Sequence, residues 1–254
     1  MTRLSVNLNK VALLRNSRTL GIPSVTRAAR TALDAGAHGI TVHPRPDGRH
    51  ILPHDVRELA VLLAGEREAE FNVEGNPFQS MMELVRAVRP QQCTLVPDDP
   101  GAFTSDHGWD LTNDDGRLAP VITELKTLGI RVSLFMDPIA GQMAAAHALG
   151  ADRVELYTEP YARAFASATE AITLEKYAQA ASAAAAAGLG VNAGHDLNQE
   201  NLALFLARVP GVLEVSIGHA LIADAMETGL ADAVRGYLRE IQRGTAGEVR
   251  GRAA

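Results

Sequence analysis

Cysteine is almost absent from this chain. The single residue, Cys93, lies in the apolar run Cys93-Thr94-Leu95-Val96, which is typical of a core segment. One cysteine excludes an internal disulfide and a zinc site built from cysteines, and it fits a reducing cytosol. An excess of basic residues is also absent, since 24 Lys and Arg stand against 30 Asp and Glu, for a net charge of −6. No broad positive surface is available for a nucleic-acid backbone, so any phosphate must be held by a few local cations and by backbone N–H groups.

Long hydrophobic runs are missing as well, although 46% of the 254 residues are hydrophobic. No segment reaches the length of a membrane span, and residues 1–10 lack the apolar block of a secretory signal. We therefore expect a soluble, cytoplasmic protein that binds small molecules, and neither membrane nor nucleic acid. Its length is common for one α/β barrel with a single large core.

Short strand-like runs alternate with helical stretches along almost the whole chain. The apolar patterns predict strands at residues 3–8, 38–43, 70–74, 93–96, 131–135, 152–157, 190–193 and 213–217. Helices are predicted at residues 23–35, 55–64, 79–88, 118–128, 141–149, 169–187, 198–208 and 220–243, the last one broken near Gly229. Strict alternation predicts a single (β/α)8 TIM barrel over residues 1–243, followed by a disordered tail over 244–254.

The alternative fold is an open, doubly wound sheet. No G-x-G-x-x-G follows the first strand, where a dinucleotide-binding fold needs it, and this favours the closed barrel. One connection, residues 98–116, is long and has no regular pattern. Because it follows a strand, we expect it on the active face of the barrel, as a mobile lid.

Polar side chains stand at or near the ends of several predicted strands. His43, with Arg45 and His50 close behind, follows the run Gly39-Ile40-Thr41-Val42, and Glu74, His195 and His219 end later strands. In a parallel barrel these ends converge at one mouth. His43 suits general acid–base chemistry, and burial of Glu74 would raise the pKa of its carboxyl group. A buried ion pair is the structural alternative for Glu74.

Further polar residues fit the same mouth. Glu155 lies one place deeper in its strand and suits orientation or stabilisation, whereas Asn7 and Asn9 are predicted to share the inward face of the first strand. Gly194-His195-Asp196 and Gly218-His219 join the last two strands to helices, the usual phosphate position of this fold. Three histidines and two glutamates can also form a metal site, but no His-x-His pair follows the first strand, so a metal is the minor alternative.

Taken together, the motifs resemble the pyridoxine 5'-phosphate synthase family. They are Val6-Asn7, Leu14-Arg15-Asn16 with Arg18, Gly39-Ile40-Thr41-Val42-His43 with Arg45, Arg49-His50, Leu95-Val96-Pro97, Val132-Ser133-Leu134-Phe135, Val191-Asn192-Ala193-Gly194-His195 and Ile217-Gly218-His219-Ala220. The resemblance implies a (β/α)8 barrel that assembles as a homo-octamer. It also implies a transferase of vitamin B6 biosynthesis that condenses 3-amino-2-oxopropyl phosphate with 1-deoxy-D-xylulose 5-phosphate, releasing phosphate and water, with no metal and no cofactor.

The resemblance also implies roles for individual residues. His43 and Glu74 match proton acceptors, His195 matches a proton donor, and Glu155 matches a residue that stabilises a transition state. The residues that match substrate-binding positions are Arg45, His50 and Thr104 for the pentulose phosphate, and Asn7, Arg18, Gly218 and His219 for the aminoketone phosphate. The chain departs from better-known members at three positions near the substrates: Asn9 and Lys10 replace Asp-His, and Asp196 replaces a glycine.

Two other functions are compatible with part of this pattern. A phosphosugar aldolase or isomerase can use the same barrel, and an aldolase of the Schiff-base type needs a lysine near the mouth, for which Lys10 and Lys126 are the nearest candidates. A non-catalytic phosphometabolite-binding protein would keep phosphate-binding residues without needing His43, Glu74 and His195 together. The joint presence of these three side chains favours an enzyme.

Overall fold

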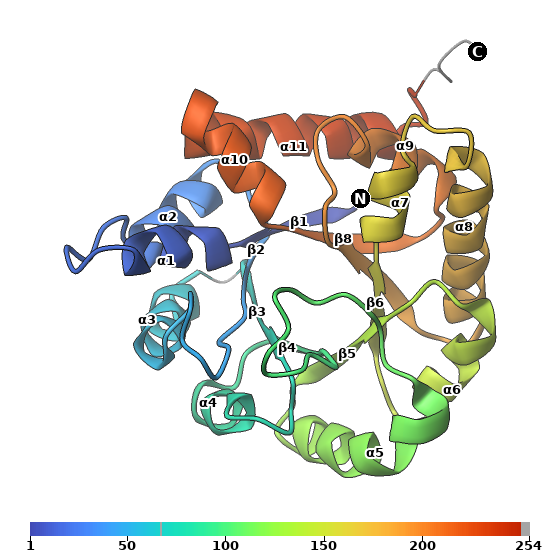
Figure 1. The fold of residues 1–254 in the computed structure, drawn as a ribbon, viewed down its shortest axis with the longest axis horizontal. Helices are drawn as coiled ribbons and strands as arrows, with labels where there is room; N and C mark the ends of the chain where they lie inside the picture. The colour runs from blue at the N-terminus through green and yellow to red at the C-terminus, as the bar shows by residue number, and fades with distance from the viewer. Residues whose placement is uncertain (67, 250–254) are drawn as a thin grey trace.

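Eight parallel strands close into a barrel in the computed structural model, which describes residues 1–66 and 68–249 (Figure 1). Each strand pairs with the next along the chain, and the last pairs with the first. The strands are β1 (Arg3–Asn7), β2 (Gly39–Val42), β3 (Glu70–Gly75), β4 (Gln92–Leu95), β5 (Arg131–Met136), β6 (Arg153–Tyr157), β7 (Gly190–Gly194) and β8 (Val212–Ile217). This topology confirms the predicted TIM barrel and excludes the open sheet.

Helices surround the barrel on its outside, as Figure 1 shows. They are α1 (Asn9–Asn16), α2 (Val25–Asp34), α3 (Pro53–Ala64), α4 (Met81–Val88), α5 (Leu111–Thr127), the 3-10 turn η1 (Ala140–Gln142), α6 (Met143–Ala148), α7 (Glu159–Ala164), α8 (Glu170–Ala186), α9 (Leu202–Arg208), α10 (His219–Thr228) and α11 (Leu230–Thr245). The predicted break at Gly229 is present, with a φ of 87° that glycine adopts without strain.

The strands are buried on both faces, which explains their nearly continuous apolar runs. Outward side chains such as Ile40 pack under the helices in the hydrophobic core. Inside the barrel the side chains are partly polar, and they bond to one another across strands. Ser5 Oγ lies 2.7 Å from Thr41 Oγ1, and the amide of Asn72 joins Thr41 on one side to Thr94 on the other. The barrel interior is therefore a packed polar layer beneath the mouth.

Most element boundaries differ from the predictions by a few residues, and three of the differences bear on the site. Strand β1 ends at Asn7, and Asn9 already begins helix α1, so the two asparagines do not share a strand face. Helix α5 begins at Leu111 because the Asp110 side chain accepts the Thr112 N–H and caps it, and the helix accommodates Gly116 and Pro120. The irregular connection therefore spans residues 96–110 and not 98–116.

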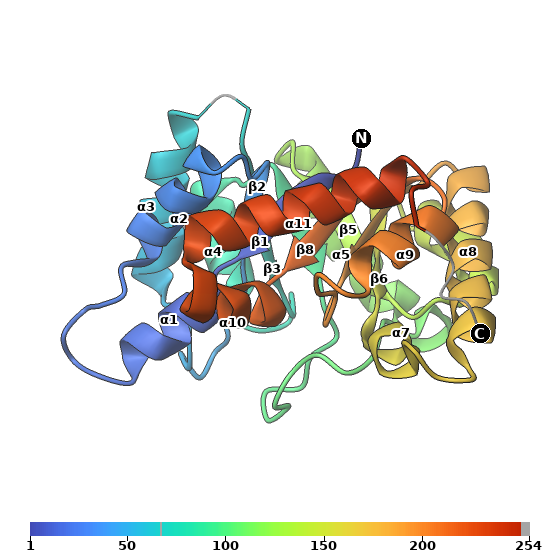
Figure 2. The same ribbon diagram turned by 90° about the horizontal axis from the view of Figure 1, so that it is seen from above.

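The connection 96–110 lies on the face formed by the carboxyl ends of the strands, and Figure 2 shows it projecting from the side on which α10 begins. At the other end of the chain, α11 reaches Thr245, two residues past the predicted domain limit. Residues 250–254 of the predicted tail lie outside the described residues. No helix in the described part of the chain has the length and apolar character needed to cross a membrane.

Candidate active site

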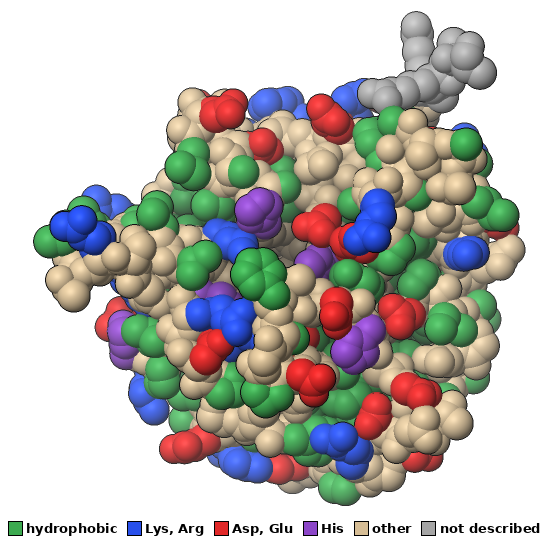
Figure 3. Space-filling view, in the orientation of Figure 1, with side chains coloured by type: hydrophobic (Ala, Val, Ile, Leu, Met, Phe, Trp, Pro, Cys, Tyr) green, Lys and Arg blue, Asp and Glu red, His purple; other side chains and the backbone are tan. Residues whose placement is uncertain are grey.

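A cavity of about 420 Å³ opens at the carboxyl ends of the strands. Charged and histidine side chains gather around the hollow at the centre of this face (Figure 3). The lining residues that were predicted for the site are Asn7, Asn9, Lys10, His43, Arg45, His50, Glu74, Thr104, Glu155, His195, Asp196, Gly218 and His219. Residues from six strand ends and two connections thus meet in one space, as parallel strands in a closed barrel require.

Glu74 lies near the end of β3, with 8% of its surface exposed. Its Oε1 accepts a hydrogen bond of 2.8 Å from Asn7 Nδ2, which reaches it from the end of β1, two strands away in the barrel. Burial, followed by the charge of Asp98, raises the pKa of Glu74 to about 7. At neutral pH this carboxyl group is therefore divided between its two protonation states, which is the condition that suits acid–base catalysis.

His43 follows β2 and is also buried. Its backbone N–H donates to Asn9 Oδ1 at 2.9 Å, so the asparagine at the start of α1 holds the end of β2 in place. Burial, followed by the positive charges of Arg45 and Arg49, lowers the pKa of His43 to about 3. The imidazole is therefore neutral and can accept a proton.

His50 lies next to His43, with ring centroids 6.0 Å apart. The backbone N–H of Ile51 donates to His50 Nδ1 at 2.9 Å, so Nε2 carries the proton of the neutral ring. Burial and the neighbouring His43 lower the pKa of His50 to about 3. A neutral His50 can donate one hydrogen bond from Nε2 without bringing a charge.

Arg45 and Arg49 hold the connection 96–110 by its backbone. Arg45 donates to the carbonyl oxygens of Asp99 and Ala102, at 3.1 and 2.8 Å. Arg49 donates to those of Ala102 and Phe103, at 3.2 and 2.9 Å. The two guanidinium groups therefore tie the middle of the connection to the mouth of the barrel.

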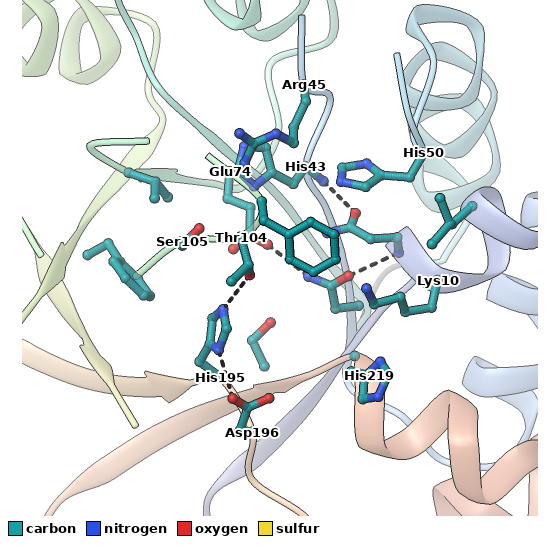
Figure 4. Close-up of a pocket in the computed structure, with 18 of the residues that line it drawn as sticks. Lys10, His43, Arg45, His50, Glu74, Thr104, Ser105, His195, Asp196 and His219 are labelled. Carbon is teal, nitrogen blue, oxygen red and sulfur yellow. Dashed lines mark hydrogen bonds and ion pairs between the residues drawn. The ribbon is translucent and has the colours of Figure 1, made fainter. Parts of the chain in front are cut away.

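His195 ends the β7 side of the cavity, opposite His43 and Glu74 (Figure 4). Its Nε2 lies 3.0 Å from Thr104 Oγ1 of the connection, and its Nδ1 lies 3.4 Å from Asp196 Oδ2. The hydrogen bond from His195 lowers the pKa of Asp196. Both residues have positive φ values, 90° and 60°, which is strained backbone for residues other than glycine. Because of the contact between Nδ1 and Oδ2, the Asp196 carboxylate faces the ring of His195.

Glu155 lies deeper in the barrel and is 3% exposed. Burial, followed by the charge of Glu74, raises its pKa well above the ordinary value. A Cβ atom on Gly194 would lie 2.3 Å from Glu155 Oε1, so the carboxyl group has its place because position 194 carries no side chain. A neutral Glu155 can both donate and accept a hydrogen bond at the floor of the cavity.

Lys10, Gly218 and His219 form the remaining wall, where α1 and α10 begin; Figure 4 shows Lys10 and His219 side by side at the mouth. Arg18 is the exception among the predicted residues. It is exposed in the turn after α1 and does not line the cavity.

Sequence reasoning missed several residues of the cavity wall. They are Leu13, Arg49, Val96, Phe103, Ser105, Phe135 and Ser216. Strand alternation could have identified Ser216, which lies on β8 two places before Gly218. No pattern in the sequence marked Asp98, whose carboxylate contacts Arg45 beneath the wall. Within residues 1–66 and 68–249, no group of three or more His, Cys, Asp or Glu side chains is placed to hold a metal ion.

Comparisons with known proteins agree with one another. The model of the family described as "Pyridoxal phosphate biosynthesis protein PdxJ" matches residues 4–243. A protein of Albidiferax ferrireducens named pyridoxine 5'-phosphate synthase is 58% identical over 248 residues, covering 96% of this chain and 98% of its own. A protein of the same name from Xanthomonas campestris is 57% identical over 250 residues, covering 96% of this chain and 97% of its own.

Solved structures share the fold at low sequence identity. Phosphoribosyl anthranilate isomerase from Thermotoga maritima matches with a TM-score of 0.59 at 14% identity, covering 95% of this chain and 99% of its own. Tryptophan synthase from Mycobacterium tuberculosis matches with a TM-score of 0.63 at 12% identity, covering 94% and 92%. At these identities the likeness extends to the barrel alone.

Proposed function

This chain belongs to the family of pyridoxal phosphate biosynthesis proteins PdxJ, and we propose that it acts as a pyridoxine 5'-phosphate synthase. The reaction condenses 3-amino-2-oxopropyl phosphate with 1-deoxy-D-xylulose 5-phosphate and releases phosphate and water. One observation carries the proposal at the level of the site. A carboxyl group with a pKa near 7, a neutral imidazole and a second histidine face one cavity.

The chemistry needs several proton transfers, and the three side chains can share them. The amine of the aminoketone attacks the ketone of the pentulose, and the imine forms between the two substrates. Elimination and ring closure then require protons to be taken from carbon and given to departing oxygens. Glu74 and His43 are the bases in this proposal, and His195 is the acid. Glu155, buried below them, stabilises charge that develops in the transition state.

The phosphates and polar groups of the substrates contact the walls of the cavity. We assign the pentulose phosphate to the side of the cavity formed by Arg45, His50 and Thr104. The aminoketone phosphate is assigned to the side of Gly218 and His219, because backbone N–H groups at the start of α10 can bind an anion there. Asn9 and Lys10 contact the pentulose across the mouth. Asn7 acts through its hydrogen bond to Glu74, and Asp196 acts through His195.

The family also supports statements about the context of the enzyme. We propose a cytoplasmic homo-octamer that takes small phosphorylated substrates and binds no nucleic acid. The reaction proceeds on protein side chains alone, without a metal or an organic cofactor.

The direct test mixes the purified protein with the two phosphorylated substrates and follows product by absorbance and mass. Formation of pyridoxine 5'-phosphate, dependent on both substrates, is the expected result. Lys10 lines the cavity, whereas Lys126 is paired with Asp152 on the outside, so borohydride reduction during turnover separates the alternatives. A reduced adduct on Lys10 and no pyridoxine 5'-phosphate would indicate a Schiff-base aldolase instead.

A further inference from the structure

Asp98 is a buried carboxylate whose position is fixed by its own backbone. It follows β4 and is 4% exposed. Its carbonyl oxygen accepts hydrogen bonds from the side-chain amides of Asn76 and Gln79, at 2.9 and 3.0 Å. These contacts anchor Asp98 to the connection after β3. Asp98 is therefore held at the mouth of the barrel, although it belongs to the connection 96–110.

The carboxylate of Asp98 contacts two side chains that follow β2. Its Oδ2 lies 2.6 Å from Arg45 Nη1 and 3.6 Å from His43 Nε2. Its charge is also the second cause, after burial, of the raised pKa of Glu74. One fixed negative charge thus faces both of the proposed bases, and the Arg45 guanidinium compensates it.

Arg45 has a hydrogen-bonding capacity that the structure does not use. Its Nη2 donates only to carbonyl oxygens of the connection, and its Nε is buried without a partner among the described residues. Buried donors normally have an acceptor, so Arg45 has a donor left over for a ligand oxygen. A phosphate makes stronger, bidentate contacts with a guanidinium than neutral carbonyl oxygens do.

We propose that Asp98 is a positioning residue for the two bases and that Arg45 is its exchangeable counter-charge. When a substrate phosphate takes the Arg45 guanidinium, the Asp98 carboxylate acts on His43 and Glu74 without compensation. Substrate binding thereby makes both side chains stronger bases. The inference rests on the proposed function, because that function supplies the phosphate.

The charge of Asp98 raises the pKa of Glu74, as this mechanism requires, and its action on His43 rests on the 3.6 Å contact between the two side chains. Burial lowers the pKa of His43 most, Arg45, Arg49 and His195 lower it further, and Asp47 raises it. A phosphate that neutralises the arginines removes part of this lowering and therefore raises the pKa of His43 above about 3, while burial continues to lower it. Around Glu74, Asp98 and Glu214 raise the pKa, whereas His195 and the hydrogen bond from Asn7 lower it. Glu155 faces Glu74 from β6 and is itself held toward its neutral form.

The test is the variant Asp98→Asn, which keeps the shape of the side chain and removes its charge. In this variant kcat falls about tenfold, less than the loss expected on removal of a base. The acidic limb of the kcat profile, which reports the enzyme with substrate bound, moves to lower pH by about one unit, because Glu74 loses a negative neighbour. KM for 1-deoxy-D-xylulose 5-phosphate stays level or falls, because Arg45 no longer has a competing carboxylate. An unmoved limb with a raised KM would mean that Asp98 only holds Arg45 in place, and would overturn the proposal.

Two matched variants complete the experiment. Asp98→Glu keeps the charge and restores the position of the acidic limb. Asp106→Asn removes an exposed carboxylate from the same connection, outside the cavity, and leaves the profile unchanged. A limb that moves equally in Asp106→Asn would show a general charge effect and contradict the proposal.

A titration without turnover separates this inference from the proposed function. NMR follows the His43 imidazole of the wild-type protein, alone and with 1-deoxy-D-xylulose 5-phosphate as the only ligand. The expected result is a rise in the pKa of His43 on binding, and a smaller rise in Asp98→Asn. Equal rises in both proteins would overturn the role of Asp98 even if the enzyme makes pyridoxine 5'-phosphate. Binding and the expected shift without product would leave the coupling valid and refute the synthase.

Discussion

At the scale of single residues, Glu74 combines burial with an ionisable group at the centre of the proposed chemistry. Replacement by glutamine keeps the volume and the oxygen that accepts from Asn7, and removes the proton-accepting charge. We expect Glu74→Gln to lose roughly 10²-fold or more in turnover, the usual scale for a positioned acid–base group, with little change in substrate binding. Steady-state kinetics measure both quantities. Glu83→Gln on the surface of α4 is the matched control and keeps full activity. Near-normal turnover with weakened binding would make Glu74 a binding residue.

The same carboxyl group makes stability depend on pH. Its folded pKa of about 7 lies above the ordinary value of 4.5, so the unfolded chain releases this proton first as pH rises. The protonated Glu74 carboxyl group contributes fully to the free energy of unfolding below pH 4.5, and this contribution is lost as pH rises through 7. The loss amounts to about 3 kcal/mol, because each unit of difference between the folded and unfolded pKa corresponds to 1.36 kcal/mol. Glu74→Gln is therefore more stable than wild type at pH 8, and the difference disappears near pH 4.5. Urea unfolding at both pH values measures it. A difference independent of pH would contradict the assigned pKa.

The sequence predicted most residues of the cavity because they follow one rule, that parallel strand ends meet at one mouth. The rule placed His43, Glu74 and His195 correctly without any knowledge of distance. It did not extend to Asp98 and Arg49, because their contacts are made between two irregular connections whose paths depend on backbone carbonyl positions. Arg18 was predicted to bind substrate only because it matches a family motif. It lies in the exposed turn after α1 and does not line the cavity of its own chain.

At the scale of elements, the connection 96–110 is anchored at both ends by buried contacts and held in its middle by side-chain hydrogen bonds. Trp109 donates from its ring to Leu95 O at 2.8 Å and from its backbone to Phe135 O at 3.0 Å. Between the anchors, contacts to the barrel come from Arg45, Arg49 and His195, and the Phe103 side chain is 89% exposed. These hydrogen bonds come from side chains that line the cavity, so we expect residues 99–107 to move as a lid when substrates replace them.

Hydrogen exchange tests the lid directly. With both phosphorylated substrates held by the Glu74→Gln variant, exchange at residues 99–107 slows by about tenfold or more relative to the free protein, because an ordered lid shields its backbone N–H groups. Helix α5 is the internal control, and its exchange is slow in both states. Exchange at 99–107 that is the same with and without ligands would remove the lid from the mechanism.

Gly108 forms the anchor next to Trp109. A Cβ atom there would lie 2.2 Å from the backbone N of Asp137, whereas one on Gly101 of the same connection would meet nothing within 4 Å. Gly108→Ala is expected to displace the anchor, to cost about 1–3 kcal/mol of stability and to lower kcat/KM. Gly101→Ala is the matched control and retains both. Denaturation midpoints and kinetics of the two variants provide the comparison, and identical behaviour would show that the anchor is dispensable.

Element prediction succeeded wherever apolar periodicity was long. It did not predict α1 and α7, which have 8 and 6 residues and follow closely after β1 and β6. Their polar residues were interpreted as strand ends or loops. It also began α5 seven positions too late, since Gly116 and Pro120 are helix-breaking in isolation but lie in the exposed first turns of a helix capped by Asp110. Local propensity alone is therefore a weak guide to helices that are short or that depend on a cap.

At the scale of the whole molecule, the surface around α1 and α2 carries exposed apolar side chains, including Leu14, Leu20 and Ile22. Apolar groups gathered on one surface favour association. The octamer implied by the family has eight times the chain mass of 27.0 kDa. Static light scattering at micromolar concentration is expected to give that mass, independent of salt, and a monomer mass would refute the proposed assembly.

The closure of the barrel between β1 and β8 also sets when the protein can become active during its synthesis. Thr2 Oγ1 donates to Val212 O across 210 positions of sequence, and Arg3 stands beside Glu214. The first strand therefore leaves the ribosome long before its second neighbour exists, and until then it has an open edge. Asn7 and His219 come from these same two ends of the chain. The barrel closes and the cavity is completed in the same step. A nascent chain whose barrel is still open is therefore expected to be inactive.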